Sequence, residues 1–181
     1  LAIVQIQLEE YDRALAHYEK TIEAYQLLSG EKPDIFEPYL AATYTNLGIL
    51  LAENMNKYPQ AFEANEAAMS LYKGLSGRYP DRYTHYLATS MHNAGIYRLE
   101  TGAWPDALGY LSKALAIRKE LATGQGEAFG ADYCATALNL LEYYQRKLEE
   151  HKELSYIRKG LDLIEETEAF LKQVPVTPAV E

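Results

Sequence analysis

Apolar residues recur along most of the chain at the spacing of a helix face, with polar residues between them. Residues 86–97, YLATSMHNAGIY, are an example, with small residues along one side and a glycine in the middle. No segment alternates apolar and polar residues as a half-buried strand does, so we expect an all-α protein without a sheet. Gly95 is unusual in this setting, because glycine inside a helix costs about 1 kcal/mol relative to alanine.

The pattern returns every 47 residues. Segments that begin at Tyr39, Tyr86 and Tyr133 read YLAATYTNLGIL, YLATSMHNAGIY and YCATALNLLEYY. A second series keeps nearly the same interval and begins at positions 11, 58, 104 and 151. Between residues 11–53 and 58–100, 16 of 43 positions are identical. The chain is therefore built from a repeated unit, which is typical of repeat architectures.

Each unit is predicted to contain two helices, A and B. In the third unit we expect helix A over residues 82–101 and helix B over residues 105–122. The glycines and prolines between units predict breaks there. Gly30 and Gly77 are expected to end B helices, and Asp34 and Asp81 to cap the next A helices.

The stop between helix A and helix B is predicted at Gly102 in the third unit. Asn54 or Asn56 is expected to serve the same purpose one unit earlier. In the last unit the alignment places Leu154 and Leu161 where the other units have alanine, and no residue of 145–156 clearly breaks the helix.

The repeat also explains the glycine. Gly48 and Gly95 recur at the same place in helix A, and alanines recur in helix B at positions 61, 68, 107 and 114. Small residues on facing helices allow a close approach, and the packing gained offsets the propensity cost. A helix pair of this kind has apolar surface left over, so neighbouring pairs are expected to stack.

These residues resemble the tetratricopeptide repeat (TPR). Its helix A signature is similar to Tyr44, Leu47 and Gly48, and to Met91, Ala94 and Gly95; its helix B signature is similar to Ala107, Leu111 and Ala114. The 47-residue unit is longer than the usual one of about 34 residues, and is similar to the long repeats of kinesin light chain and bacterial regulatory proteins. The resemblance implies an α-solenoid, a right-handed superhelix of antiparallel helix pairs with about 3.5–4 repeats.

The resemblance covers residues 1–172 as one domain. We expect repeats at about 1–34, 35–81, 82–128 and 129–172, followed by a flexible, proline-rich tail at 173–181. Residues 131–172 allow two interpretations, an atypical end repeat or a longer helical pair packed differently, and the in-register Tyr133, Ala135 and Thr136 favour the end repeat.

The resemblance implies that A helices line a concave groove that binds a peptide or a partner protein. Asn46 and Asn93 occupy the place of an asparagine that often bonds a bound peptide in relatives, although bonds to neighbouring helices are equally consistent. No clamp for a C-terminal carboxylate is expected, because the equivalent positions carry no cation. The candidate partner-binding residues are Thr45, Asn46, Ile49, His92, Asn93, Ile96, Asn139, Tyr143 and Arg146.

Sixteen tyrosines are many for 181 residues. Several recur at the same place in successive units, as Tyr39, Tyr86 and Tyr133 do, and so do Tyr25 and Tyr72. Recurrence of this kind favours packing between repeats over a binding role.

The net charge and the motifs exclude further classes of function. A net charge of −9 argues against nucleic acid and anionic membranes. The four histidines lack metal-binding spacing, and GQGEAFG at 124–130 is interpreted as a joint and not as a phosphate loop. We expect no enzyme, no cofactor and no metal, but a cytoplasmic interaction module for an unknown protein or peptide. The alternatives are a regulatory or sensor segment of a larger bacterial signalling protein, and weak self-association through the solenoid ends.

Overall fold

The computed structural model describes residues 2–125 and 127–173, and within these ranges it is helical without any strand. This confirms the all-α prediction. The helices are α1 (Ala2–Gln7), α2 (Tyr11–Glu31), α3 (Pro33–Ile49), the π-helical turn η1 (Leu50–Asn54), α4 (Tyr58–Arg78), α5 (Pro80–Glu100), α6 (Trp104–Gln125), α7 (Glu127–His151) and α8 (Leu154–Leu171). Leu1, Gly126 of the GQGEAFG segment, and residues 174–181 of the predicted tail lie outside the described residues.

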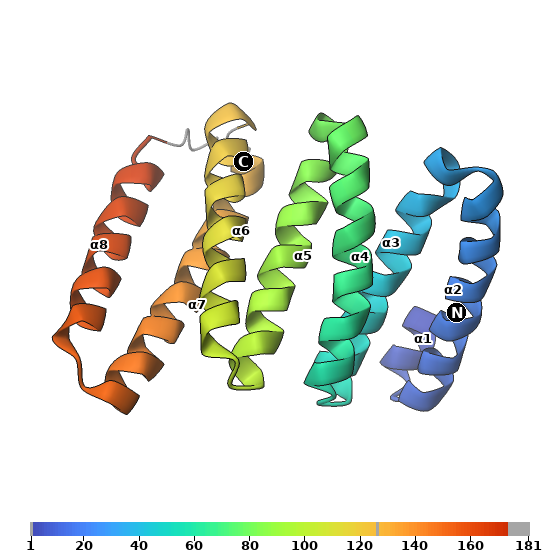
Figure 1. Cartoon of the computed structure of the whole chain (residues 1–181), viewed down its shortest axis with the longest axis horizontal. Coiled ribbons are helices and arrows are strands. Elements are labelled where there is room, and N and C mark those ends of the chain that lie inside the picture. Colours follow the sequence, from blue (N-terminus) through green and yellow to red (C-terminus); the bar gives the residue numbers. More distant parts are fainter. Residues whose placement is uncertain (1, 126, 174–181) are drawn as a thin grey trace, which may run out of the picture.

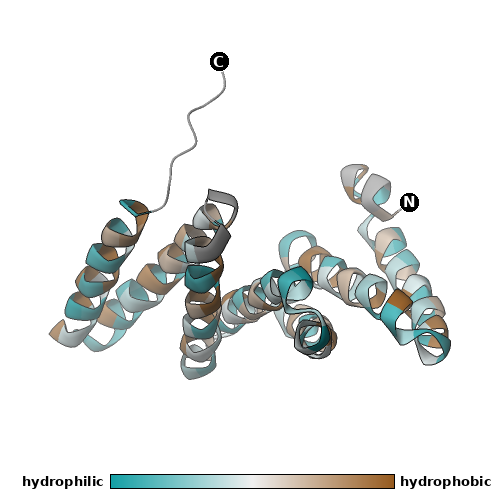
Figure 2. Ribbon diagram, turned by 90° about the horizontal axis from the view of Figure 1, so that it is seen from above, coloured by the Kyte–Doolittle hydropathy of each residue, from teal (hydrophilic) through white to brown (hydrophobic). Residues whose placement is uncertain are grey.

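The helices form two layers in a row, and each packs against the next along the chain. Helices α2, α4, α6 and α8 make the layer nearer the viewer in Figure 1, and α3, α5 and α7 make the other. The first set are the B helices and the second set the A helices. Figure 2 shows this row from above, with hydrophobic and hydrophilic residues interleaved along the helices. The core is therefore a series of clusters between successive helices, as expected of an α-solenoid.

The recurring glycines lie at close contacts between A and B helices. A Cβ at Gly95 would be 2.5 Å from Cγ of Leu111 on α6, and a Cβ at Gly48 would be 3.2 Å from the carbonyl oxygen of Ala61 on α4. The packing explanation for these glycines is confirmed.

The joints between units differ in detail from the prediction. Helices α2 and α4 run one residue beyond Gly30 and Gly77. The prediction that Asp34 and Asp81 are N-caps is wrong: both lie in the first turn, behind a proline at the first helical position. A negative charge in the first turn still interacts favourably with the helix dipole.

The stops within units use left-handed residues. Asn56, and not Asn54, has a positive φ of 53°, and Gly102 has a φ of 74°. Lys152 has a φ of 55° and separates α7 from α8. Lysine is not a residue that typically marks such a stop, which explains why the sequence showed no break there.

The last unit is a helix pair that packs on α6 in the same order as the earlier pairs, in line with an end repeat. The expectation that Leu154 and Leu161 replace the alanines is wrong, because both side chains are exposed and Leu163 and Phe170 are buried instead. Gly160 of α8 lies against Leu141 of α7. The small residue of the pair has thus moved from helix A to helix B.

Candidate functional site: a tyrosine-lined groove on the A helices

A groove of about 720 Å³ lies between the first halves of α3 and α5. Ile35, Pro38 and Tyr39 line it from α3, and His85 and Tyr86 from α5. Ile35 is 53% exposed, Tyr39 55% and Tyr86 43%, which is high for large apolar side chains. Exposed apolar surface gathered in a groove is typical of a binding site.

The two exposed tyrosines are held in place by two inner ones. Tyr39 stacks on Tyr25 with ring centroids 5.7 Å apart, and Tyr86 stacks on Tyr72 at 5.2 Å. Tyr72 is buried, and burial raises the pKa of its hydroxyl to about 12. Each outer ring is therefore fixed by stacking before any partner binds, so little side-chain entropy is lost on binding.

The groove also presents polar groups. Pro38 has no N–H, so the carbonyl of Asp34 lacks the donor that it would have four residues on in a regular helix. Arg78 reaches across from α4 to pair with Asp34 at 3.5 Å and with Glu37. On the α5 side, the guanidinium of Arg82 lies 5.3 Å from the centroid of the Tyr83 ring. Acceptors and donors thus flank an apolar centre.

The predicted site residues of α3 lie one to two turns beyond this groove. Thr45 is half-buried and donates to the carbonyl oxygen of Ala41 at 3.1 Å. Asn46 is exposed, and Ile49 is half-buried. Within the described chain, neither Asn46 nor Asn93 of α5 forms a side-chain hydrogen bond, so both amides are free for a ligand.

His92 and Asn139 are brought together in a polar network between α5 and α7. His92 Nδ1 lies 3.2 Å from Oγ1 of Thr136, and its Nε2 lies 3.4 Å from Nδ2 of Asn139. Arg118, buried on α6, donates to Oγ1 of Thr136 and to the carbonyl oxygen of Asp132. These side chains link three helices, so part of the predicted surface holds the repeats together.

Burial governs the charge of this network. Burial, and then the nearby Arg118 guanidinium, lower the pKa of His92 to about 4, so the imidazole is neutral at neutral pH. Burial lowers the pKa of Arg118 as well, and the Asp132 carboxylate opposes that shift. Burial also lowers the pKa of His85, which borders the groove.

The remaining predicted residues are mostly structural. Ile96 packs against the core cluster of the first units, and Tyr143 is buried beside Trp104. Arg146 pairs with Glu142 and lies 3.4 Å from Glu100. The structure therefore does not gather the nine predicted residues into one site.

The groove tyrosines were missed because of how the sequence was interpreted. The prediction that recurring tyrosines pack between repeats is confirmed for Tyr39 and Tyr86, which stack on tyrosines of the preceding unit. Both are nevertheless about half exposed, unlike the buried Tyr133, and this exposure was not predicted. The signal was present, since Tyr39 and Tyr86 fall on the same helix face as Ile35 and Arg82, four residues earlier in each helix. Tyr133 differs because Phe170 of α8 covers its ring at 4.3 Å.

The described residues offer neither a metal site nor a membrane-spanning helix. They contain no group of three or more His, Cys, Asp or Glu side chains placed to hold a metal ion. Among the same residues, no helix combines the length and the apolar character that a membrane crossing requires.

Comparison with known proteins identifies the repeat. Residues 39–120 match the tetratricopeptide repeat family model. The fold is similar to that of BtubC (BKLC) from P. vanneervenii, with a TM-score of 0.72 and 20% sequence identity; the match covers 100% of this chain and 65% of that one. This chain thus spans about two thirds of that protein's length, and at such identity the likeness shows the fold alone. No curated protein matches the sequence significantly. Residues 39–120 therefore belong to the tetratricopeptide repeat family, and the helix pairs on both sides of them stack in the same way.

Proposed function

We propose that this protein binds an extended peptide segment of a partner protein on its A-helix face, with the groove between α3 and α5 as the main binding site. Tetratricopeptide repeats generally mediate protein–protein interactions. The observation that carries the proposal is the pair of exposed tyrosines, Tyr39 and Tyr86, one repeat apart and each stacked on an inner tyrosine.

The polar groups of the groove suit a peptide backbone. The free carbonyl of Asp34 accepts a peptide N–H, and the tyrosine hydroxyls and Arg82 donate to peptide carbonyls. Farther along the same face, the amides of Asn46 and Asn93 offer both a donor and an acceptor. An extended segment that crosses α3 and α5 would meet these groups together with the aromatic rings.

The experiment is selection of peptides from a random displayed library on the whole chain, followed by affinity measurement. The Tyr39→Ala/Tyr86→Ala double variant should bind a selected peptide at least about tenfold more weakly, because aromatic anchors commonly dominate such interfaces. Asn46→Ala/Asn93→Ala should weaken binding less. As a control, Leu138→Ala/Leu154→Ala removes two exposed side chains at the far end of the row and should leave the peptide affinity unchanged. If the tyrosine variant kept full affinity for the peptide, the groove between α3 and α5 would not be its binding site.

A second candidate function is self-association through the α7–α8 end. Leu138, Leu154 and Leu161 are all more than half exposed there, and with Ile164 they form an apolar surface on the last helix pair. A second copy could cover this surface. Sedimentation velocity at rising concentration should show dimers that Leu154→Glu/Leu161→Glu abolishes, and a monomer throughout would exclude the function.

A further inference from the structure

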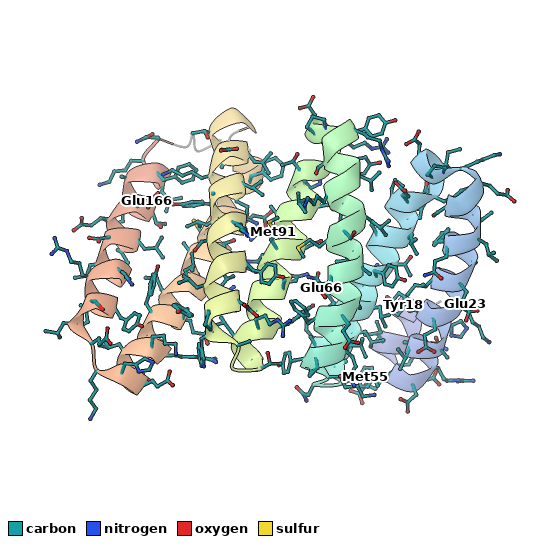
Figure 3. The ribbon with its side chains drawn as sticks, viewed as in Figure 1. Tyr18, Glu23, Met55, Glu66, Met91 and Glu166 are labelled. Atoms are coloured by element: carbon teal, nitrogen blue, oxygen red, sulfur yellow. The ribbon has the colours of Figure 1, made fainter. Side chains whose placement is uncertain are left out.

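A second cavity, of about 520 Å³, lies on the opposite side of the molecule from the A-helix face. It opens between the B helices α4 and α6, and α5 forms its floor. Met69, Leu87, Met91 and Tyr110 make an apolar lining, and Lys73 and Lys113 stand on its two walls. Figure 3 labels Met91 and Glu66 in this space. Two of the chain's three methionines thus line one cavity.

Comparison with the preceding repeat shows why the cavity is open. One unit of 47 residues earlier, Tyr44 stands in the place of Met91, and Gln26 in the place of Lys73. Nε2 of Gln26 donates to the hydroxyl of Tyr44 at 2.9 Å. That ring and its hydrogen bond occupy the space between α2 and α4. In the next unit a narrower, flexible methionine and a lysine leave the corresponding space unfilled.

Comparison with the following repeat shows what the lysine lacks. Lys119 on α6 has the position of Lys73 on α4, and its Nζ lies 2.5 Å from Oε1 of Glu166 on α8. Figure 3 shows Glu166 on the side of α8 near α6. Neither Lys73 nor Lys113 forms an ion pair with any described residue. Glu66 is the one acidic residue in the cavity lining, so this lining carries a net positive charge on a chain of net charge −9.

We propose that this cavity docks an acidic partner segment that inserts one apolar side chain and places a carboxylate beside Lys73 and Lys113. The inserted side chain takes the position that the ring of Tyr44 has in the preceding repeat. The carboxylate takes the position that the carboxylate of Glu166 has in the following repeat. Methionine suits such a lining, because its unbranched, polarisable side chain adapts to different partner shapes. The carboxylate accepts charge-assisted hydrogen bonds from the ammonium groups, which sets the preference for acidic over basic segments.

This site is separate from the groove of the proposed function. The two lie on different faces of α5, with Tyr86 and His85 in the groove and Leu87 and Met91 in the cavity. Loss of one site therefore leaves the other intact.

Methionine methyl NMR tests the proposal directly, because the chain has three methionines and Met55 lies outside the cavity lining. The probe is the acetylated peptide Asp-Glu-Leu-Glu-Asp, titrated into the whole chain labelled at the methionine methyl groups. We expect the signals of Met69 and Met91 to shift and that of Met55 to stay. A peptide with lysine in place of each acidic residue should shift none of them. No shift with the acidic peptide, or equal shifts with both peptides, overturns the proposal.

A matched variant rebuilds the arrangement of the preceding repeat. Met91→Tyr/Lys73→Gln should fill the cavity and lower the affinity for the acidic peptide at least about tenfold. Circular dichroism should show an unchanged helix content. Lys113→Gln, which alters only a surface charge, should lower the affinity for the acidic peptide about threefold. Tyr39→Ala/Tyr86→Ala should leave the affinity unchanged. Undiminished affinity in both cavity variants, or loss in the tyrosine variant, would place the peptide elsewhere and refute the site.

Discussion

Gly95 lies at a close contact between α5 and α6, and Leu111 fills the space beside it. Leu111 is fully buried, so it cannot move aside when a methyl group arrives 2.5 Å from its Cγ. We expect Gly95→Ala to lower the free energy of unfolding by about 1 kcal/mol or more, because overpacking outweighs the helix propensity gained. Urea denaturation measures the difference.

The same substitution at an open position should have the opposite sign. Gly74 on α4 and Gly109 on α6 have nothing within 4 Å of an added Cβ. Gly74→Ala and Gly109→Ala should therefore raise the free energy of unfolding by about 0.5–1 kcal/mol. If all three variants were stabilised equally, contact with Leu111 would not be the reason for the glycine.

The partly buried imidazole of His92 gives the protein a predictable response to acid. The pKa of His92 is about 4 in the folded chain against 6.5 for an ordinary histidine. Between these values the unfolded chain binds more protons, so folding stability falls as the pH falls through this window, by up to about 3 kcal/mol. His92→Gln should remove that part of the pH dependence in urea denaturation at pH 7 and pH 4. An identical pH dependence in the variant would show that His92 is not its source.

Helix α8 shows how far an element can be placed from the repeat alone. The alignment at 47 residues predicts that a B helix follows α7, and it does. The register of that helix was not predictable, because Lys152 carries a positive φ without glycine or asparagine to signal it. The side chains that face α7 therefore differ from those expected. The candidate site shows a similar limit: the A-helix face was predicted, but how far a recurring tyrosine is covered depends on the next helix. Phe170 of α8 covers Tyr133, whereas Tyr86 stays 43% exposed.

The observed register of α8 can be tested with two leucines two residues apart. Leu163 is buried against α7, and Leu161 is 54% exposed. Leu163→Ala should cost about 2–4 kcal/mol of unfolding free energy, and Leu161→Ala less than about 0.5 kcal/mol. Thermal and urea denaturation give the comparison. Equal costs, or a larger cost at Leu161, would favour the register in which Leu161 replaces an alanine.

The whole molecule is a row of helices in which each contacts mainly its neighbours in sequence. Stability in such a row is a sum over units and the interfaces between them, and the two ends have one interface each. The α4–α5 pair is packed on both sides, by α3 and by α6. At the α8 end, Leu154, Ile157 and Leu161 remain exposed, so this element buries less apolar surface than the inner B helices.

Because inner helices are packed on two sides and end helices on one, local unfolding should become easier toward the ends of the row. Amides in the middle of α4 and α5 should exchange with solvent at least about tenfold more slowly than those in the middle of α8, because opening an end unit breaks one interface and opening an inner unit breaks two. Hydrogen exchange with mass spectrometry resolves these segments. Both proposed sites lie on the central units, which are the units expected to unfold locally least often. Uniform protection from α2 to α8 would instead mean that the row unfolds as a single cooperative body.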